Sequence, residues 1–405
     1  MNNCLIAQSG GPTSVINASV TGLLEANSDN NIYDTVYGGL YGIEGIMENK
    51  FINLSNLSKE DLFNFKHTPS SGLGSCRYKL KKVSESCEEY EKIFDTFKEL
   101  NIRSFFYIGG NDSMDTVLKL SSYAAETGKN VNIIGIPKTI DNDLPLTDHT
   151  PGFGSAAKFI SAVTLDCYFD TCVYKDNGIF ILETMGRNTG WLAASSILGI
   201  INEKPVADFI YVPESPFYIN KFLSEVTNKY MEQKRVFIVA AEGLKNDNGI
   251  FISKLSPTNT RDKFGHTQLG GVGTYLKYLI TKSGITNRVK VLELNILQRC
   301  AAHYASAIDI EEASMVGRAA LMYSKDNVSG KMVGIKRLCS NPYSSEPFLI
   351  DAAEAANGIK YFPKEWIDTK NSFIRADAYK YFLPLIQGIP DVNMNNNIKY
   401  ISLIK

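Results

Sequence analysis

The sequence PKTIDNDL, residues 137–144, decides the fold. It follows VNIIGI, residues 131–136, an apolar run rich in β-branched residues, which predicts a buried strand of a parallel sheet. Residues 137–144 are therefore expected to form a loop at a strand's carboxyl end, where open α/β sheets bind their ligands. The loop offers a lysine, a threonine and two aspartates, a set that suits phosphoryl transfer. The alternative is a solvated turn, because Asp and Asn often bond their own backbone.

A second loop of the same kind lies upstream. RSFFYI, residues 103–108, is another apolar strand candidate, and it runs into GGNDS, residues 109–113, and then a helix-like stretch over 114–125. Glycines at a strand-to-helix turn let backbone N–H groups approach a phosphate at the helix N-terminus. Two such loops in succession favour a ligand site over a pair of solvated turns.

The first 145 residues alternate strand, glycine turn and helix, which predicts a doubly wound parallel sheet. A first strand is expected at residues 4–7 and a helix from about Ser14, whereas residues 46–66 are expected to be polar and helical. A long helix from 155 to about 170 precedes a second α/β unit that begins at Ile179. A chain of 405 residues exceeds the usual single core, so about two domains are expected.

Composition and charge exclude several classes of protein. A net charge of −1 gives no bulk attraction for nucleic acid, and no apolar run reaches the ~18 residues that a membrane span requires. The seven cysteines are scattered and include no Cys-x-x-Cys pair, which argues against a disulfide framework or a structural zinc site. We therefore expect a cytoplasmic protein without nucleic-acid or membrane partners. The asparagine cluster within residues 393–397 is expected in a surface tail.

GGNDS at 109–113 followed by PKTIDND at 137–143 resembles the paired signature of the phosphofructokinase family, in its pyrophosphate-dependent branch. Weaker similarity continues to about residue 366. Further matches occur in the family's order at Ser9-Gly10-Gly11, 73–77, 183–187, Pro213-Glu214 and 241–243.

The resemblance implies two Rossmann-like, doubly wound α/β domains with the active site in the cleft between them. One is expected to bind the phosphoryl donor and to comprise residues 1–151 plus about 290–355. The other is expected to bind the sugar phosphate and to comprise about 152–289 plus 356–405.

The resemblance also implies an activity. The enzyme would reversibly transfer a phosphoryl group from pyrophosphate to the 1-hydroxyl of fructose 6-phosphate, with Mg²⁺ as cofactor and a homodimer or homotetramer as assembly. Family members that use ATP have glycines where Asp112 and Lys138 stand. The alternatives are an ATP-dependent 6-phosphofructokinase and a non-catalytic, sugar-phosphate-binding regulatory subunit, and loss of Asp141 or Arg187 would have favoured the latter.

In the resembled mechanism Asp141 takes the proton of the sugar hydroxyl, Thr139 orients that hydroxyl, and Lys138 neutralises phosphate charge. The expected catalytic residues are Lys138, Thr139, Asp141, Asp112 and Arg187. Donor binding is expected at Gly10, Gly11, Arg77, Gly110, Asn111, Asp112, Ser113 and Lys138. Substrate binding is expected at Gly11, Thr139, Ile140, Asp141, Met185, Gly186, Arg187, Glu242, Arg288 and Arg299, with Arg288 reaching a neighbouring subunit's site. The expected metal ligands are Asn111, Asp112 and Asp143, although the family normally has an aspartate where Asn111 stands.

Overall fold

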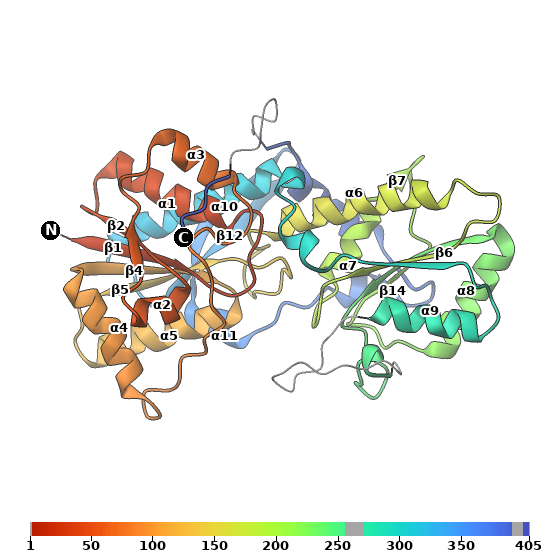
Figure 1. The fold of residues 1–405 in the computed structure, drawn as a ribbon, viewed down its shortest axis with the longest axis horizontal. Coiled ribbons are helices and arrows are strands. Elements are labelled where there is room, and N and C mark those ends of the chain that lie inside the picture. The colour runs from red at the N-terminus through yellow and green to blue at the C-terminus, as the bar shows by residue number, and fades with distance from the viewer. Residues whose placement is uncertain (1, 256–270, 391–399, 405) are drawn as a thin grey trace. The chain divides into compact units, whose positions relative to one another are not determined.

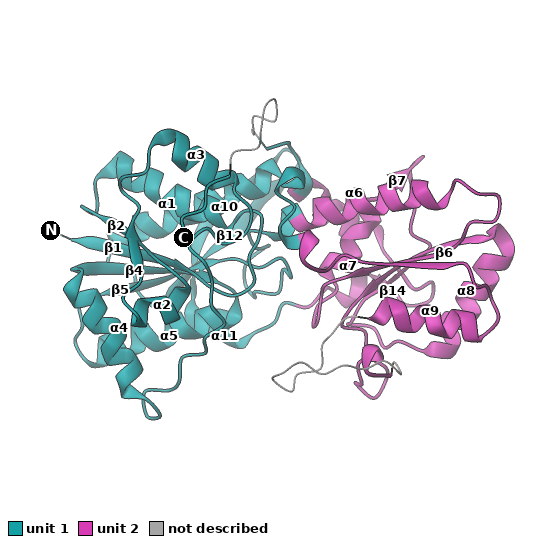
Figure 2. Ribbon diagram, in the orientation of Figure 1, with its two compact units in different colours: residues 1–155, 299–360, 386–405 teal, residues 156–298, 361–385 magenta. Residues whose placement is uncertain are grey.

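A computed structural model describes residues 2–255, 271–390 and 400–404, so the asparagine cluster within 393–397 lies outside the described residues. The chain forms two compact units, shown in Figure 2. Unit 1 comprises residues 1–155, 299–360 and 386–405, and unit 2 comprises 156–298 and 361–385.

The return of the chain to unit 1 at residue 386 differs from the division expected from the sequence, which placed all of 356–405 in the second domain. Hydrogen bonds account for this return. The carbonyl oxygen of Gln387 accepts from Ser306 Oγ at 2.9 Å and from the backbone N of Ile308 at 3.4 Å, both at the start of a helix of unit 1.

Unit 1 is built on a seven-stranded sheet with the order β13-β12-β5-β4-β1-β2-β3. The five central strands run parallel and the two edge strands, β13 and β3, pair antiparallel. The parallel α/β architecture is therefore confirmed, with antiparallel edges. The strands are β1 (Asn3–Gln8), β2 (Val36–Gly39), β3 (Phe51–Asn53), β4 (Ile102–Gly109), β5 (Asn132–Pro137), β12 (Lys331–Ser340) and β13 (Tyr343–Asp351).

Helices cover both faces of this sheet because alternate strand residues point to opposite sides. Leu5 and Ala7 pack in one apolar core with α2, α4, α5 and α11, while Cys4 and Ile6 pack in the other with α1, α3 and α10. The helices are α1 (Ile16–Asn30), α2 (Gly42–Met47), α3 (Lys59–His67), α4 (Cys87–Glu99), α5 (Asn111–Glu126), α10 (Ala307–Ser324) and α11 (Ala352–Asn357).

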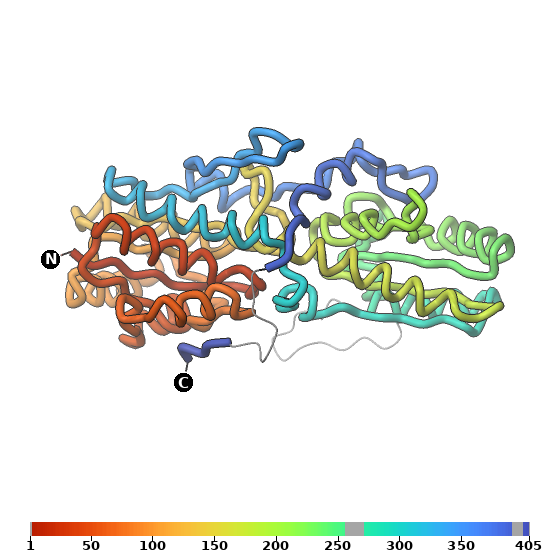
Figure 3. The backbone as a smooth tube through the Cα atoms, turned by 90° about the horizontal axis from the view of Figure 1, so that it is seen from above, coloured from red at the N-terminus to blue at the C-terminus, as the bar shows by residue number. Residues whose placement is uncertain are grey.

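Helices α1 and α10 lie side by side, as Figure 1 and Figure 3 show. Their close approach requires glycine at the crossing point. A Cβ on Gly22 would lie 2.1 Å from the carbonyl oxygen of Ser314, and one on Gly317 would lie 1.9 Å from that of Ser19. A side chain at either glycine would therefore push the two helices apart.

The region 46–66 was expected to be helical, and this prediction is wrong in part. The edge strand β3 separates α2 from α3. With three residues, β3 is too short to show a period of two in the sequence, so its pairing with β2 decides its conformation.

Unit 2 has a four-stranded, fully parallel sheet with the order β11-β6-β10-β9. Its strands are β6 (Gly178–Thr184), β9 (Phe209–Tyr211), β10 (Arg235–Ala241) and β11 (Val289–Glu293), with short pairs β7 (Ile200–Ile201), β8 (Lys204–Pro205), β14 (Ile367–Asp368) and β15 (Phe373–Ile374). Its helices are α6 (Phe153–Thr171, entering from unit 1), α7 (Trp191–Ser195), α8 (Ile219–Gln233), α9 (Val272–Lys282) and α12 (Ala376–Phe382). No helix within the described ranges is long and apolar enough to cross a membrane.

Candidate active site

The two loops predicted from the sequence to bind a ligand begin at the paired carboxyl ends of neighbouring strands in the unit 1 sheet. Gly109 at the end of β4 pairs with Pro137 at the end of β5, and the backbone N of Lys138 donates to the Gly109 carbonyl at 3.0 Å. On the other side of β4, Ser9 follows β1, and its hydroxyl lies 2.6 Å from that of Ser113. The structure therefore brings together the loops after β1, β4 and β5.

Lys138 is buried where these loops meet, with 3% of its surface exposed. Its Nζ donates to the Gly11 carbonyl at 2.7 Å, and it lies only 3.2 Å from where a Cβ on Gly10 would stand. Burial lowers the pKa of Lys138 to about 8, although Asp141 and Asp143 act to raise it. Because a nearby anion favours the charged ammonium, a bound phosphate would restore its full charge.

The two aspartates of the loop, Asp141 and Asp143, are both half-buried. The backbone N of Asp141 donates to Thr139 Oγ1 at 3.1 Å. Burial raises the pKa of the Asp143 carboxyl, against hydrogen bonds from its own backbone and from Thr139 that lower it. The carbonyl of Thr139 accepts from Thr150 Oγ1 at 2.8 Å, so the far end of the loop folds back on its start.

Asn111 and Asp112 open α5, directly after the glycine pair 109–110. Asp112 is exposed in the first turn, whereas Asn111 is half-buried. Asn111 Nδ2 donates to the Gly358 carbonyl at 3.3 Å, and its Oδ1 is buried without a hydrogen-bond partner among the described residues. Those residues contain no cluster of three or more His, Cys, Asp or Glu side chains that could hold a metal ion.

Two arginines of unit 1 lie close enough to act on Lys138, and both lower its pKa. Arg77 is exposed and follows a loop that is fixed to β1, since the Gly10 N donates to the Cys76 carbonyl at 2.9 Å. Arg299 belongs to unit 1, and its Nη1 lies 3.1 Å from where a Cβ on Gly11 would stand. Arg299, expected at the sugar phosphate, is thus placed beside the predicted donor loops.

The predicted sugar-phosphate residues of unit 2 also follow neighbouring strands. Met185, Gly186 and Arg187 come after β6 and Glu242 comes after β10, and these strands pair with Thr184 opposite Ala241. Burial raises the pKa of Glu242, while the Gly186 N–H and the Arg187 guanidinium lower it. The structure therefore brings these four residues together.

Arg288 does not join that group within the chain. It precedes β11, so it stands at the amino end of a sheet whose carboxyl end carries Met185. Its guanidinium donates to the Asp176 carbonyl, and its side chain is exposed.

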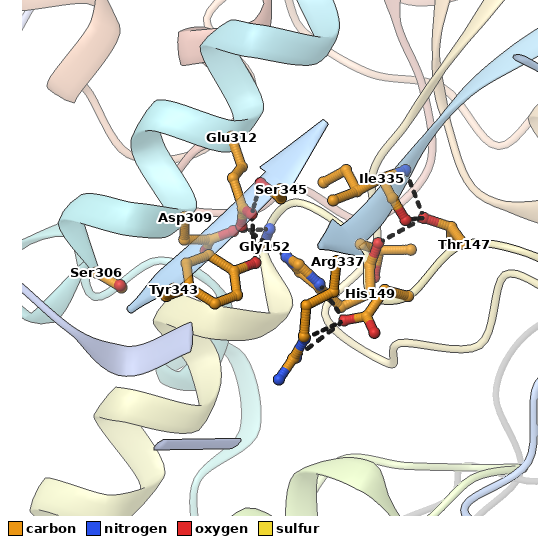
Figure 4. A network of polar contacts seen from close by, with 12 residues as sticks. Thr147, His149, Gly152, Ser306, Asp309, Glu312, Ile335, Arg337, Tyr343 and Ser345 are labelled. Carbon is orange, nitrogen blue, oxygen red and sulfur yellow. Dashed lines mark hydrogen bonds and ion pairs between the residues drawn. The ribbon is translucent and has the colours of Figure 1, made fainter. Parts of the chain in front are cut away.

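A buried polar network, missed in the sequence, fixes the segment after the predicted catalytic loop (Figure 4). His149 contacts Asp148 at 2.8 Å through Nδ1 and Glu312 at 2.6 Å through Nε2. Glu312 also accepts from the Tyr343 hydroxyl, and Asp148 accepts from Arg337 at 2.9 Å. Burial lowers the pKa of His149, but the carboxylates of Glu312 and Asp148 outweigh it and raise that pKa to about 9. Glu312 lies on α10, and Arg337 and Tyr343 lie on the β12–β13 hairpin, far along the chain, so no local sequence pattern predicts their contacts.

Comparison with known proteins identifies the family. A family model described as Phosphofructokinase matches residues 3–323. A pyrophosphate–fructose 6-phosphate 1-phosphotransferase of Halomonas elongata is 37% identical over 391 residues, which cover 96% of this chain and 92% of that protein. A protein of the same name from Methylococcus capsulatus is 38% identical over 389 residues, which cover 95% of this chain and 92% of that protein.

The crystal structure of a pyrophosphate-dependent phosphofructokinase from Marinobacter aquaeolei is similar with a TM-score of 0.87 and 34% identity, covering 99% of this chain and 96% of that one. The paired loops after β4 and β5 and these full-length similarities together establish that the chain belongs to the phosphofructokinase family.

Proposed function

We propose that the protein transfers a phosphoryl group from pyrophosphate to the 1-hydroxyl of fructose 6-phosphate, giving fructose 1,6-bisphosphate and phosphate. The observation that carries the proposal is the buried Lys138 ammonium, held against the Gly11 carbonyl where the loops after β1, β4 and β5 meet. A compact donor with several negative charges needs a fixed cation of this kind. Both relatives described above bear the name of this activity.

On this proposal the chemistry is divided among three residues of one loop. Asp141 accepts the proton of the sugar hydroxyl. Thr139, whose Oγ1 already contacts the Asp141 backbone, orients that hydroxyl. Lys138 balances the charge that moves from the transferred phosphoryl group to the leaving phosphate. The reaction is reversible because donor and leaving group are both small phosphates.

The phosphates and the sugar would be held by the remaining residues. Backbone N–H groups at Gly11 and Gly110, with Arg77, suit the donor. The N–H groups of Gly10 and Ser113 already donate to the Cys76 and Gly110 carbonyls, so Gly10 would allow close approach of the donor and Ser113 would offer its hydroxyl. Arg187 suits the 6-phosphate because a guanidinium binds phosphate through two hydrogen bonds, and the neighbouring Glu242 suits sugar hydroxyls. Arg299 lies beside Gly11, a position from which it would contact phosphate.

The residues present fit a Mg²⁺ ion that arrives with the donor. Asn111 Oδ1 is a buried oxygen without a partner in the described structure, and Asp112 and Asp143 add two carboxylates. Mg²⁺ is usually held by one or two carboxylates together with substrate phosphates. When bound, the ion would neutralise phosphate charge.

Asp112 and Lys138 favour pyrophosphate over ATP. A carboxylate at 112 would repel the α-phosphate of a nucleotide, while Lys138 supplies charge that a short donor needs. Coupled assays with pyrophosphate and ATP side by side test the proposal, and faster turnover with pyrophosphate is expected. Turnover of neither donor would instead favour a regulatory subunit.

A homodimer or homotetramer is part of the proposal. The exposed Arg288, remote from Met185 within its own chain, supports a role at a neighbouring subunit's site. Light scattering measures the number of subunits in the assembly. Arg288→Met should raise the KM for fructose 6-phosphate while the number of subunits stays unchanged.

A further inference from the structure

Lys360 is the last residue of unit 1 before the chain passes into unit 2. Its ammonium donates three hydrogen bonds to the turn that follows Asp141. The acceptors are Asn142 Oδ1 at 2.9 Å, the Thr147 carbonyl at 3.2 Å and the Asp148 carbonyl at 2.7 Å. Burial lowers the pKa of Lys360 to about 7, although Asp148 and Asp143 act to raise it. In the ammonium form, which dominates below that pH, the three protons suffice for the three acceptors.

The backbone around Lys360 contacts the same region. The Lys360 N donates to the Asp143 carbonyl at 2.8 Å, and the Gly358 carbonyl accepts from Asn111. Residues 358–360 therefore contact both loops that carry the proposed chemistry, although they lie more than two hundred positions further along the chain.

The turn over residues 142–148, which Lys360 contacts, contains backbone conformations that need support from surrounding contacts. Asn142 is fully buried with a φ of +53°, and Leu146 has a φ of +65°. Such left-handed conformations in residues other than glycine persist only when surrounding contacts enforce them. At Asn142, the side-chain oxygen accepts a hydrogen bond from Lys360, one of the contacts that hold this turn.

We propose that Lys360 is a positioning residue for phosphoryl transfer: its ammonium closes the turn over residues 142–148 and so fixes Asp141, the residue directly before that turn. The inference rests on the proposed role of Asp141 as base. It predicts that loss of the ammonium lowers the rate of the chemical step while the substrates still bind, because misplacing a catalytic group costs rate even when binding contacts remain.

The test compares Lys360→Met with wild type by steady-state kinetics and thermal unfolding. Lys360→Met should lower kcat by about tenfold or more and leave both KM values within about threefold. Asn142→Gly, which allows the left-handed backbone but removes the acceptor, should lower kcat in the same way and decides the question if Lys360→Met does not fold. Lys364→Met, at an exposed lysine four positions on, is the matched control and should behave as wild type.

A double variant separates positioning from general support of the fold. If Lys360 acts through Asp141, adding Lys360→Met to Asp141→Asn should slow turnover by no more than about threefold further. Losses that multiply in the double variant, or a folded Lys360→Met enzyme with kcat within about threefold of wild type, would overturn the inference. If Asp141→Asn alone cost less than about tenfold, the role of Asp141 itself would fail, an outcome distinct from either result for Lys360.

Discussion

The Nζ of Lys138 and the backbone carbonyl of Gly11 lie 2.7 Å apart and are joined by a hydrogen bond. Lys138 follows β5 and Gly11 follows β1, so this bond crosses over the end of β4, which separates the two strands. The cation proposed to bind the phosphoryl donor is thereby fixed before any ligand arrives. A charge that is already in place stabilises a transition state without reorganisation.

Donor choice should depend on Lys138 together with Asp112. Replacing both by glycine, the residue of ATP-using family members, removes the repelling carboxylate and the short-range cation. We expect pyrophosphate activity to fall by about 10²-fold or more, as for loss of a key electrostatic group, and partial ATP activity to appear. Coupled assays with each donor measure both changes. A wild-type enzyme that turns over faster with ATP would contradict the interpretation.

Asp141→Asn keeps the shape of the side chain and removes its basic oxygen. A positioned general base contributes about 10²–10⁴-fold, so kcat should fall by that order while the melting temperature stays near that of wild type. If instead kcat fell less than about tenfold and only KM rose, Asp141 would be a binding residue.

Arg187 should hold the sugar phosphate. A charged hydrogen bond contributes about 1.5–3 kcal/mol, so Arg187→Met should raise the KM for fructose 6-phosphate by about 10–100-fold and leave the KM for pyrophosphate nearly unchanged. Arg318→Met is a suitable control, because that arginine pairs with Glu25 and Asp29 on the helical face of unit 1. Equal effects on both KM values would place Arg187 outside the sugar site.

His149 should make stability depend on pH. Its folded-state pKa of about 9 lies above its ordinary value of 6.5, so its contribution is complete below about pH 6.5 and is lost as the pH rises through about 9. A shift of this size corresponds to about 3 kcal/mol. Buried Lys138, whose pKa is lowered to about 8, acts in the opposite direction, so the comparison must be with a His149→Gln variant. The difference in unfolding free energy between wild type and His149→Gln, measured by urea unfolding, should shrink between pH 6 and pH 9.5. A difference that stays constant over this range would show that the His149 side chain is neutral in the folded protein.

Magnesium should bind tightly only in the presence of donor. Asn111 supplies an oxygen but no charge, so of the three predicted ligands only Asp112 and Asp143 carry charge. Calorimetry with and without a non-hydrolysable pyrophosphate analogue measures the difference, and an Asn111→Asp variant should bind Mg²⁺ more tightly without the analogue. Micromolar affinity of the wild-type protein without any phosphate, about −8 kcal/mol, would refute this expectation.

The parts of the site that could be predicted from the sequence are those whose residues lie in one contiguous stretch of the chain. The loop after β4 follows an apolar, aromatic run and the loop after β5 follows an apolar, β-branched run, and a glycine or an acidic turn marks where each strand ends. What the sequence did not reveal depends on contacts between distant segments. Lys360 is an ordinary lysine in its local sequence, and only the fold shows that it meets Asn142. The return of the chain to unit 1 depends on the backbone carbonyl of Gln387, a group that every residue possesses.

The division of unit 1 into separate chain segments also has a consequence during translation. Strand β12 pairs with β5, yet all of residues 156–298 of unit 2 are synthesised between them. A nascent chain that ends before residue 331 therefore presents the hydrogen-bonding edge of β5 without its neighbour, and unpaired edges of this kind invite association with other chains. Unit 2 can thus complete its sheet on the ribosome before unit 1 can, and arrest of synthesis in the interval should yield an aggregation-prone product.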